Sequence, residues 1–460
     1  MTEAAIVEMR RRLVRGISAS AMSPLVTALI QFGTVPVLLS AWGAGGYGDW
    51  LLLSAAPTYL AQSDLGFADA SASDMTARAA AGDREGALCT FQSSWLLLTI
   101  VSSVVGLLAS FAIWQVNWRD LFHLSTVSNE EARIILTMML IYVTVGQQAR
   151  MLEPGFRCEG RYAAGTFWAN MMRLVEAFSA TVAGVLSSSL VTAAVVYAIA
   201  RCVSAVFYYF VLRSKSCWIT LGIRHARWQS IKQLASPAIA FVALPLGQAI
   251  ELQGYTILIG MCLGPTAVAA FSTLRTLTRV NYQFVAVIGR SVWPELSAAL
   301  GAGEISLARN LHRRAAQAAL CLSLGGAFAL LSAGPFVYRT WVHSSVAFNT
   351  TCFTVLALVV AANAFWHTSL VVPMSCNRHQ RIAWTYFATT LLSLAVARVL
   401  MPFFGITGAA FALLLIDASL CCLVLRTALL QLDDTFRQFW SAITTLPRLG
   451  GPLSSKLEAV

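Results

Sequence analysis

Long apolar runs separated by short polar segments dominate the chain. Runs of roughly 20 apolar residues are long enough to cross a ~30 Å hydrocarbon core as helices. Twelve such runs occur, near 17–41, 46–70, 89–114, 131–151, 165–186, 190–213, 234–262, 266–292, 312–334, 347–371, 383–404 and 406–430. The pattern predicts an all-α integral membrane protein with about twelve transmembrane helices.

Composition agrees with this interpretation. Of the 460 residues, 57% are hydrophobic and 12% are charged, whereas about 25% of a soluble domain is charged. The net charge of +11 does not indicate a nucleic-acid partner, because no segment outside the spans is long enough to fold into a soluble basic surface. We therefore expect no nucleic acid among the partners.

The basic residues of the loops predict the topology. With these spans, the side that holds the N-terminus carries 22 of the 32 Lys and Arg residues, and the opposite side carries only Arg119, Arg133 and Arg339. Cytoplasmic loops hold the excess of Lys and Arg in membrane proteins. Both termini are therefore expected in the cytoplasm.

Both ends of the chain show amphipathic patterns. Residues 1–16 place apolar residues on one helical face and arginines on the other, which predicts an interfacial helix on an anionic leaflet. The tail, residues 431–460, repeats the pattern. Its apolar positions are Leu432, Phe436, Trp440 and Ile443. No cleavage site follows the first apolar run, so span one is expected to be retained.

The two halves of the chain resemble each other at a constant offset of 221 residues. The matched pairs include Pro24/Pro245, Gly33/Gly254, Gly43/Gly264, Gly82/Gly303 and Asp83/Glu304. An offset that covers six spans gives both copies the same orientation, as in transporters built from parallel repeats. We expect two six-helix lobes, 17–213 and 234–430, joined by a basic cytoplasmic linker at 214–233. A duplicated structural bundle without transport activity is the alternative.

Two arginines interrupt the eighth span, in the stretch STLRTLTRVNYQF at 272–284. Arg275, Arg279 and Gln283 lie four residues apart, on one face of a helix. An arginine at the centre of a spanning helix costs roughly 2.5–3.5 kcal/mol on insertion scales. This face is therefore predicted to line a water-filled cavity or to contact partners.

The repeat indicates which groups are special to one lobe. The equivalent positions in span two are Ser54, Thr58 and Gln62, so the glutamine is matched and the charges are not. Positive charge that is present in only one lobe favours binding of an anionic substrate over a structural role shared by both lobes. Arg173 and Arg201, in spans five and six, are candidates to add positive potential at the same anion-binding site. Guanidinium groups bind phosphate in a bidentate fork and stay charged, so a phosphate or pyrophosphate head group is the expected anion.

Acidic residues inside the spans offer a structural alternative. They are Asp64, Asp69, Glu176, Glu251 and Asp417. Glu176 lies three residues after Arg173 on one helix, and Glu251 on span seven is a candidate partner for Arg275. A purely structural ion network would account for these pairs. Asp69 and Arg290 occupy equivalent repeat positions and are candidates for a cytoplasmic gate between the lobes.

Other chemistry has little support in the sequence. The ten cysteines show no CxxC or Cys/His ligand spacing, which favours packing over metal binding, and no Walker motif is present. His367 is expected to be a packed neutral histidine, with a proton relay as the alternative. We expect no metal, no cofactor and no enzymatic activity.

Short motifs resemble a known family. The segment 38–70, with Gly43, Tyr47, Gly48, Asp64 and Gly66, resembles the polysaccharide-biosynthesis flippases (lipid-linked oligosaccharide or O-antigen type) of the multidrug/oligosaccharidyl-lipid/polysaccharide (MOP) exporter superfamily. Segments 263–274 and 404–412 are also similar. The resemblance implies a V of two six-helix lobes in a bacterial inner membrane. It also implies flipping of a polyprenyl-pyrophosphate-linked oligosaccharide, whose pyrophosphate Arg275 and Arg279 would meet.

Two other functions stay open. A cation-coupled multidrug or metabolite antiporter of the same fold would need unpaired cavity acids, and span one lacks the carboxylate that drug exporters often carry there. A polysaccharide polymerase would need a long outer loop, whereas the outer loops are about 115–130 and 335–346. Besides the lipid-linked substrate, membrane lipids and other polysaccharide-assembly membrane proteins are the expected partners.

Overall fold

The computed structural model describes residues 3–58, 67–232, 246–301, 303–343, 345–376 and 379–445, and every element in these ranges is helical. Side chains are described from residue 22 onward, except at 56, 58, 67, 69, 73, 77, 80, 290, 294, 298 and 301. The helices are α1 Glu3–Thr58, α2 Phe67–Ala80, α3 Arg84–Gln115, α4 Trp118–Phe122, α5 Asn129–Arg150, α6 Glu153–Cys158, α7 Tyr162–Ser187, α8 Leu190–Arg213, η2 Ile250–Gly254, α10 Tyr255–Leu263, α11 Pro265–Gly301, α12 Ile305–Val342, α13 Thr350–Ser375, α14 Gln380–Phe404, α15 Ile406–Gln431 and α16 Phe436–Thr444.

These helices confirm the all-α membrane fold. Helix α1 contains the first span and the beginning of the second, with a kink between them at Gly43, its one residue with non-helical φ and ψ. Eight helices of the described residues are long and apolar enough to cross a membrane. The long helices α7 and α11 are not among the eight, and they carry the intramembrane residues Arg173, Glu176, Arg275 and Arg279. Residues 3–16, expected as a separate interfacial helix, continue span one without a break.

The backbone repeats at the offset found in the sequence. Gly43 has φ 67° and ψ 179°, and Gly264 has φ 84° and ψ 174°. Both glycines lie between the first and second spans of their lobes, in a conformation that side-chain-bearing residues rarely adopt. Gly82 and Gly303 also share a positive φ, of 82° and 74°. Glycines with the same unusual backbone conformation therefore recur at matching positions of the two halves, as a parallel repeat predicts.

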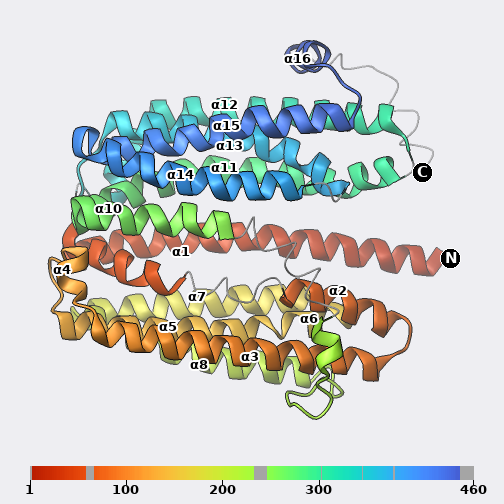
Figure 1. The fold of residues 1–460 in the computed structure, drawn as a ribbon, viewed down its shortest axis with the longest axis horizontal. Helices are drawn as coiled ribbons and strands as arrows, with labels where there is room; N and C mark the ends of the chain where they lie inside the picture. Colours follow the sequence, from red (N-terminus) through yellow and green to blue (C-terminus); the bar gives the residue numbers. More distant parts are fainter. Residues whose placement is uncertain are drawn as a thin grey trace.

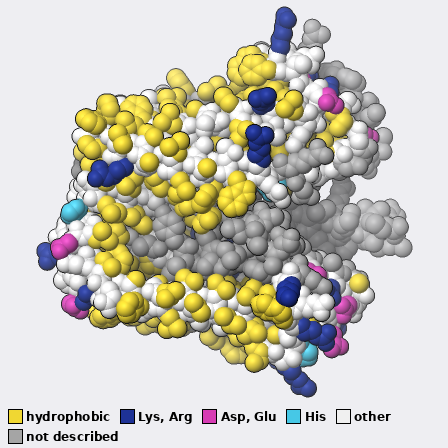
Figure 2. Space-filling model, viewed as in Figure 1, with side chains coloured by type: hydrophobic (Ala, Val, Ile, Leu, Met, Phe, Trp, Pro, Cys, Tyr) yellow, Lys and Arg dark blue, Asp and Glu magenta, His cyan; other side chains and the backbone are white. Residues whose placement is uncertain are grey.

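Figure 1 shows the arrangement of the lobes. Helices α11 to α15 form one bundle, α3, α5, α7 and α8 form the other, and the long α1 runs between them. Helix α1 begins at the same end of the molecule at which α15 ends. In Figure 2, hydrophobic side chains cover the middle of both bundles, and charged side chains gather toward the two ends. This distribution suits a lipid-facing belt with a polar end on either side.

The lobes touch at the end that holds α4 and α10 (Figure 1). A Cβ added to Gly48 would lie 2.0 Å from the Pro265 carbonyl oxygen, and one added to Gly260 would lie 2.1 Å from the Leu52 side chain. Glycine is thus needed for two helices to approach this closely. The indole nitrogen of Trp341 donates a hydrogen bond to the backbone oxygen of Phe32 at 3.2 Å, again between lobes.

We expect Gly48→Ala to weaken this interface. The new Cβ meets backbone atoms of Pro265 that cannot rotate away, and overpacking of this kind costs about 1–3 kcal/mol. Thermal unfolding of the purified protein should shift to lower temperature. Gly106→Ala is the matched control, because a Cβ at Gly106 meets nothing within 4 Å. Equal melting temperatures for the two variants would show that the helices do not pack here.

Candidate functional site

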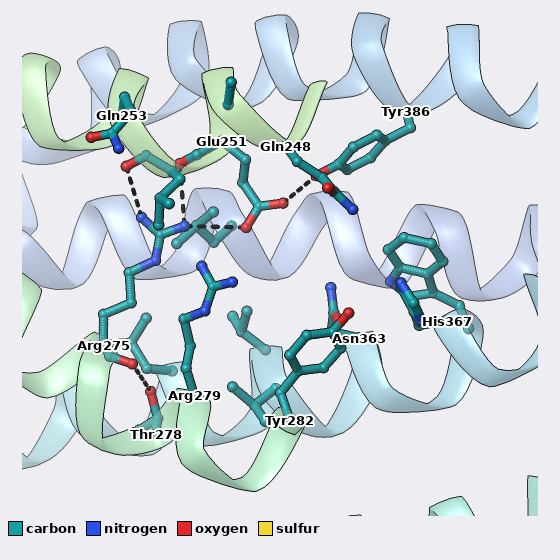
Figure 3. Close-up of a pocket in the computed structure, with 17 residues that line it drawn as sticks. Gln248, Glu251, Gln253, Arg275, Thr278, Arg279, Tyr282, Asn363, His367 and Tyr386 are labelled. Carbon is teal, nitrogen blue, oxygen red and sulfur yellow. Dashed lines mark hydrogen bonds and ion pairs between the residues drawn. The ribbon is translucent and has the colours of Figure 1, made fainter. Parts of the chain in front are cut away.

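A cavity of about 360 Å³ lies within the second lobe, where η2, α11, α13 and α14 meet. Figure 3 shows its polar side chains, with Arg275 and Arg279 side by side on α11 and both directed toward the turn that carries Glu251. The labelled lining residues are Gln248, Glu251, Gln253, Arg275, Thr278, Arg279, Tyr282, Asn363, His367 and Tyr386. Arg275 and Arg279 of the predicted polar face of span eight therefore line a cavity.

Arg275 is held by contacts within its own lobe. Its guanidinium donates to the backbone oxygens of Leu252 at 3.1 Å and Glu251 at 3.2 Å, and to Glu251 Oε1 at 3.2 Å. The residue is only 7% exposed, so desolvation makes these contacts necessary. The ion pair proposed from the sequence between Glu251 and Arg275 is present.

Glu251 connects three helices through one carboxylate. Its Oε1 accepts from Arg275, and its Oε2 accepts from the hydroxyl of Tyr386 on α14 at 2.6 Å. It lies in the π-helical turn η2. Such turns are rare and recur at functional sites. Here the turn presents two carbonyl oxygens and one carboxylate oxygen to the same guanidinium.

Arg279 differs from its neighbour. It lines the cavity and is half-buried, yet among the described residues it makes no hydrogen bond and no ion pair. Glu251, the one carboxylate among the described lining residues, already binds Arg275 and Tyr386. Within the part of the chain that the structure describes, the lining carries two guanidinium groups and one carboxylate, so the positive charge of Arg279 is not compensated there.

A buried acid lies behind the cavity wall. Asp417, which is 2% exposed, accepts hydrogen bonds at Oδ1 from the Trp366 indole at 2.7 Å and the Asn363 amide at 2.9 Å. Both donors also line the cavity. Asp417 therefore orients two lining side chains and does not itself form the lining.

A second cavity, of about 270 Å³, lies between the lobes. Helices α1, α7 and α8 contribute aromatic rings, hydroxyls and an amide, and α11 contributes Ser272 and Thr276. None of the described residues that line it is charged. Its polar and aromatic lining residues are Gln31, Thr34, Trp42, Tyr47, Trp50, Ser54, Thr181, Tyr197, Ser272 and Thr276. Neighbouring positions on helix α11 thus face two cavities, one with a positively charged lining and one whose described lining is neutral.

The first-lobe arginines lie elsewhere. Arg201 on α8 pairs with the fully buried Glu176 on α7 at 2.8 Å and also donates to the Tyr142 hydroxyl. Arg173 is exposed and donates to the Thr27 hydroxyl at 3.3 Å. The predicted pairing of Glu176 with Arg173 is therefore wrong. Glu176 pairs with Arg201, because the packing of α8 against α7 brings that guanidinium onto the carboxylate. Neither arginine lines either cavity.

Several predicted residues contribute differently or fall outside the described part. Ser54 lines the cavity between the lobes, whereas Gln283 is half-buried and lines neither cavity. Gln62 and Asp64 lie outside the described residues. So do the side chains of Thr58, Asp69 and Arg290, and with them the candidate gate. Among the described residues, no group of His, Cys, Asp and Glu side chains could hold a metal ion.

The sequence interpretation missed Asp49. This fully buried carboxylate accepts from the backbone and side chain of Thr126, both at 2.7 Å, and from the Ser125 backbone at 3.1 Å. It fixes the loop between α4 and α5 to α1. The signal was available, since an acid inside an apolar run needs a partner.

Comparison with known proteins identifies the fold. No protein-family model and no curated protein matches the chain. The chain is similar to a solved inward-facing MATE family multidrug resistance transporter of the MOP superfamily (TM-score 0.74, 14% identity, 90% of this chain and 98% of that one). It is also similar to an outward-facing structure of such a transporter (TM-score 0.60, 14% identity, 92% and 95%).

A third similar structure is a MOP superfamily transporter from Pyrococcus furiosus, described as having a binding pocket of reversed polarity that suggests a different function (TM-score 0.54, 15% identity, 96% of both chains). The chain therefore has the two-lobed fold of the MATE and MOP transporters, as the resemblance implied.

Proposed function

We propose that this protein is a transporter that flips a polyprenyl-pyrophosphate-linked oligosaccharide across a bacterial inner membrane by alternating access. The main observation behind this proposal is the position of Arg279 in the cavity. Arg279 has no hydrogen-bond or ion-pair partner among the described residues, and a guanidinium in a cavity at membrane depth is costly unless an anion compensates it. The Arg279 guanidinium can bind one phosphate of a pyrophosphate through a forked pair of hydrogen bonds. Arg275, one turn away, stays bound to Glu251 and Leu252 and adds positive charge beside that site.

The neutral cavity supports the saccharide part of the substrate. Hydroxyls and an amide can hydrogen-bond sugar hydroxyls, and the rings of Trp50 and Tyr197 offer apolar faces beside them. Because α11 lines both cavities, a pyrophosphate bound at Arg279 places an attached sugar close to the neutral lining. The described walls are uncharged, and they suit a polyhydroxyl group better than a cationic drug.

The arrangement of the lobes supports alternating access. It resembles the inward-facing structure more than the outward-facing one, with TM-scores of 0.74 and 0.60. The contacts at Gly48 and Gly260 close the end away from the start of α1. With both termini cytoplasmic, as the loop charges predict, the protein would be in the state that admits substrate from the cytoplasmic leaflet.

An antiporter of the same fold is the alternative. A cationic drug would face repulsion from Arg279, and the neighbouring acid Glu251 is already occupied. The Pyrococcus furiosus transporter is described as having a binding pocket of reversed polarity, so this fold has a precedent for a pocket whose polarity differs from that of its relatives. The positive cavity therefore favours the anionic substrate.

Cells that lack the protein provide the direct test. We expect loss of surface polysaccharide, with lipid-linked intermediates stranded on the cytoplasmic leaflet, and restoration by the wild-type gene. Sorting the intermediates by leaflet distinguishes the possibilities. Unpolymerised intermediates on the outer leaflet would indicate a polymerase, and unchanged surface glycan would favour the antiporter.

A further inference from the structure

The basic linker is folded onto the first lobe. The Gln92 side chain donates to the Thr220 backbone oxygen at 3.0 Å and accepts from the His225 backbone at 2.8 Å. Ser93 accepts from the Arg227 backbone at 2.8 Å. Gln92 and Ser93 are both buried. Two side chains of α3 thus hold residues 220–227 in a defined position.

This held segment exposes an apolar and basic surface. Ile223 is 64% exposed and Trp228 is 65% exposed. Arg224 and Arg227 are exposed beside them. A tryptophan and an isoleucine left open on an ordered loop, flanked by arginines, have the composition of a membrane–water interface.

Helix α16 presents a similar surface on the second lobe. Its buried Phe439 and Ile443 pack against Ala316 of α12 and Leu425 and Leu429 of α15. On the adjoining face, Phe436 and Trp440 are 61% and 45% exposed, and their rings stack at 6.1 Å.

Charged contacts fix α16 in place. Arg313 on α12 binds both carboxylate oxygens of Asp434, which is buried just before the helix begins. The Arg309 side chain donates to the Leu432 backbone oxygen at 3.0 Å. Arg314 and Arg437 are left exposed, and Asp433 is the exposed acid beside them. The exposed aromatic pair is therefore held rigidly and in basic surroundings.

The two surfaces occupy matching places in the fold. In Figure 1, the linker loop and α16 lie on opposite outer flanks, at a similar level along the spans and toward the end where α1 begins. Helix α16 is seen end-on, so its axis runs across the direction of the spans. A helix across the spans, at their end, lies in the plane that a bilayer surface would occupy.

We propose that the segment 220–228 and α16 are a pair of lipid anchors, one on each lobe, that insert Trp228 and Trp440 at the boundary between head groups and acyl chains and bind anionic phospholipid through the flanking arginines. Aromatic rings partition to this boundary, and Lys or Arg side chains near an anionic surface add electrostatic attraction. The anchors set the depth of each lobe separately.

The test uses the full-length protein in nanodiscs. An environment-sensitive fluorescent amino acid replaces Trp228 or Trp440, and Gln229 or Gln438 in matched controls, which are exposed polar neighbours. Nanodiscs contain phosphatidylcholine with or without phosphatidylglycerol, brominated high on the acyl chains. We expect roughly twofold or stronger quenching at 228 and 440 than at the controls, since only buried interfacial groups reach that depth.

Charge dependence is measured on the same labelled proteins. Arg224→Gln and Arg437→Gln should reduce quenching at the nearby probe in phosphatidylglycerol nanodiscs and leave it unchanged in pure phosphatidylcholine. Quenching at 228 and 440 no stronger than at the controls would overturn the proposal. Quenching at only one of the two sites would overturn the pairing of anchors, and no effect of phosphatidylglycerol would overturn the anionic preference.

Discussion

Replacing Arg279 by alanine is expected to abolish most transport while leaving the protein as stable as the wild type. Hydrogen bonds to charged groups contribute about 1.5–3 kcal/mol, so substrate affinity should fall by about 10- to 150-fold. Stability should be kept because Arg279 has no partner to lose within the described residues. The measurements are substrate binding to purified protein and restoration of surface glycan at equal protein level.

Two variants make this result interpretable. Arg279→Lys keeps the charge but loses the fork, so it should retain part of the affinity. Arg275→Ala should impair both binding and stability, because it leaves the Glu251 carboxylate without its cation. Wild-type transport by Arg279→Ala would remove the basis of the proposed substrate, and a large loss of stability in that variant would indicate a structural role for Arg279.

Glu251→Ala is expected to be the most destabilising single change in the cavity. It leaves Arg275, 7% exposed, without its carboxylate and deprives the Tyr386 hydroxyl of its acceptor. Removing one partner of a buried pair costs about 3–5 kcal/mol. Thermal unfolding in detergent should show a large downward shift, with a smaller shift for Glu251→Gln, which keeps an acceptor oxygen.

The double variant Glu251→Ala/Arg275→Met provides the control. It removes both charges, and apolar replacement of a buried pair is often close to neutral. We expect it to regain most of the lost stability and to remain defective in transport. If the double variant were as unstable as Glu251→Ala, the cost would come from packing and the lost tyrosine contact, and the ion pair would not be the cause.

The sequence predicted the fold well for a physical reason. A lipid-spanning helix must form its backbone hydrogen bonds within itself and present about 20 apolar residues. Each span can therefore be predicted from one continuous stretch of the sequence. The repeat was equally readable, because Gly43 and Gly264 meet the same backbone requirement at the kinks. Helices such as Leu190–Arg213 and Ile406–Gln431 accordingly agree with the predicted spans to within a residue.

The site was only partly predictable, because its contacts join distant parts of the chain. Glu251 and Arg275 lie on consecutive spans, so their pairing could be proposed. Tyr386 reaches the same carboxylate from 135 residues away, and no local pattern indicates it. Arg201 displaced Arg173 as the partner of Glu176 because the packing of α8 on α7 decides which guanidinium reaches the buried side.

The distribution of ion pairs has a consequence for motion. Arg201–Glu176, Arg275–Glu251 and Arg313–Asp434 each join residues of a single lobe, whereas the contacts described between lobes are close apolar packing and one indole hydrogen bond. Apolar packing and a single hydrogen bond can be exchanged for another packing of the lobes without breaking a buried ion pair. Each half can therefore tilt as a rigid body with its electrostatics intact, and the two tilted states can lie close enough in free energy for a bound substrate to decide between them.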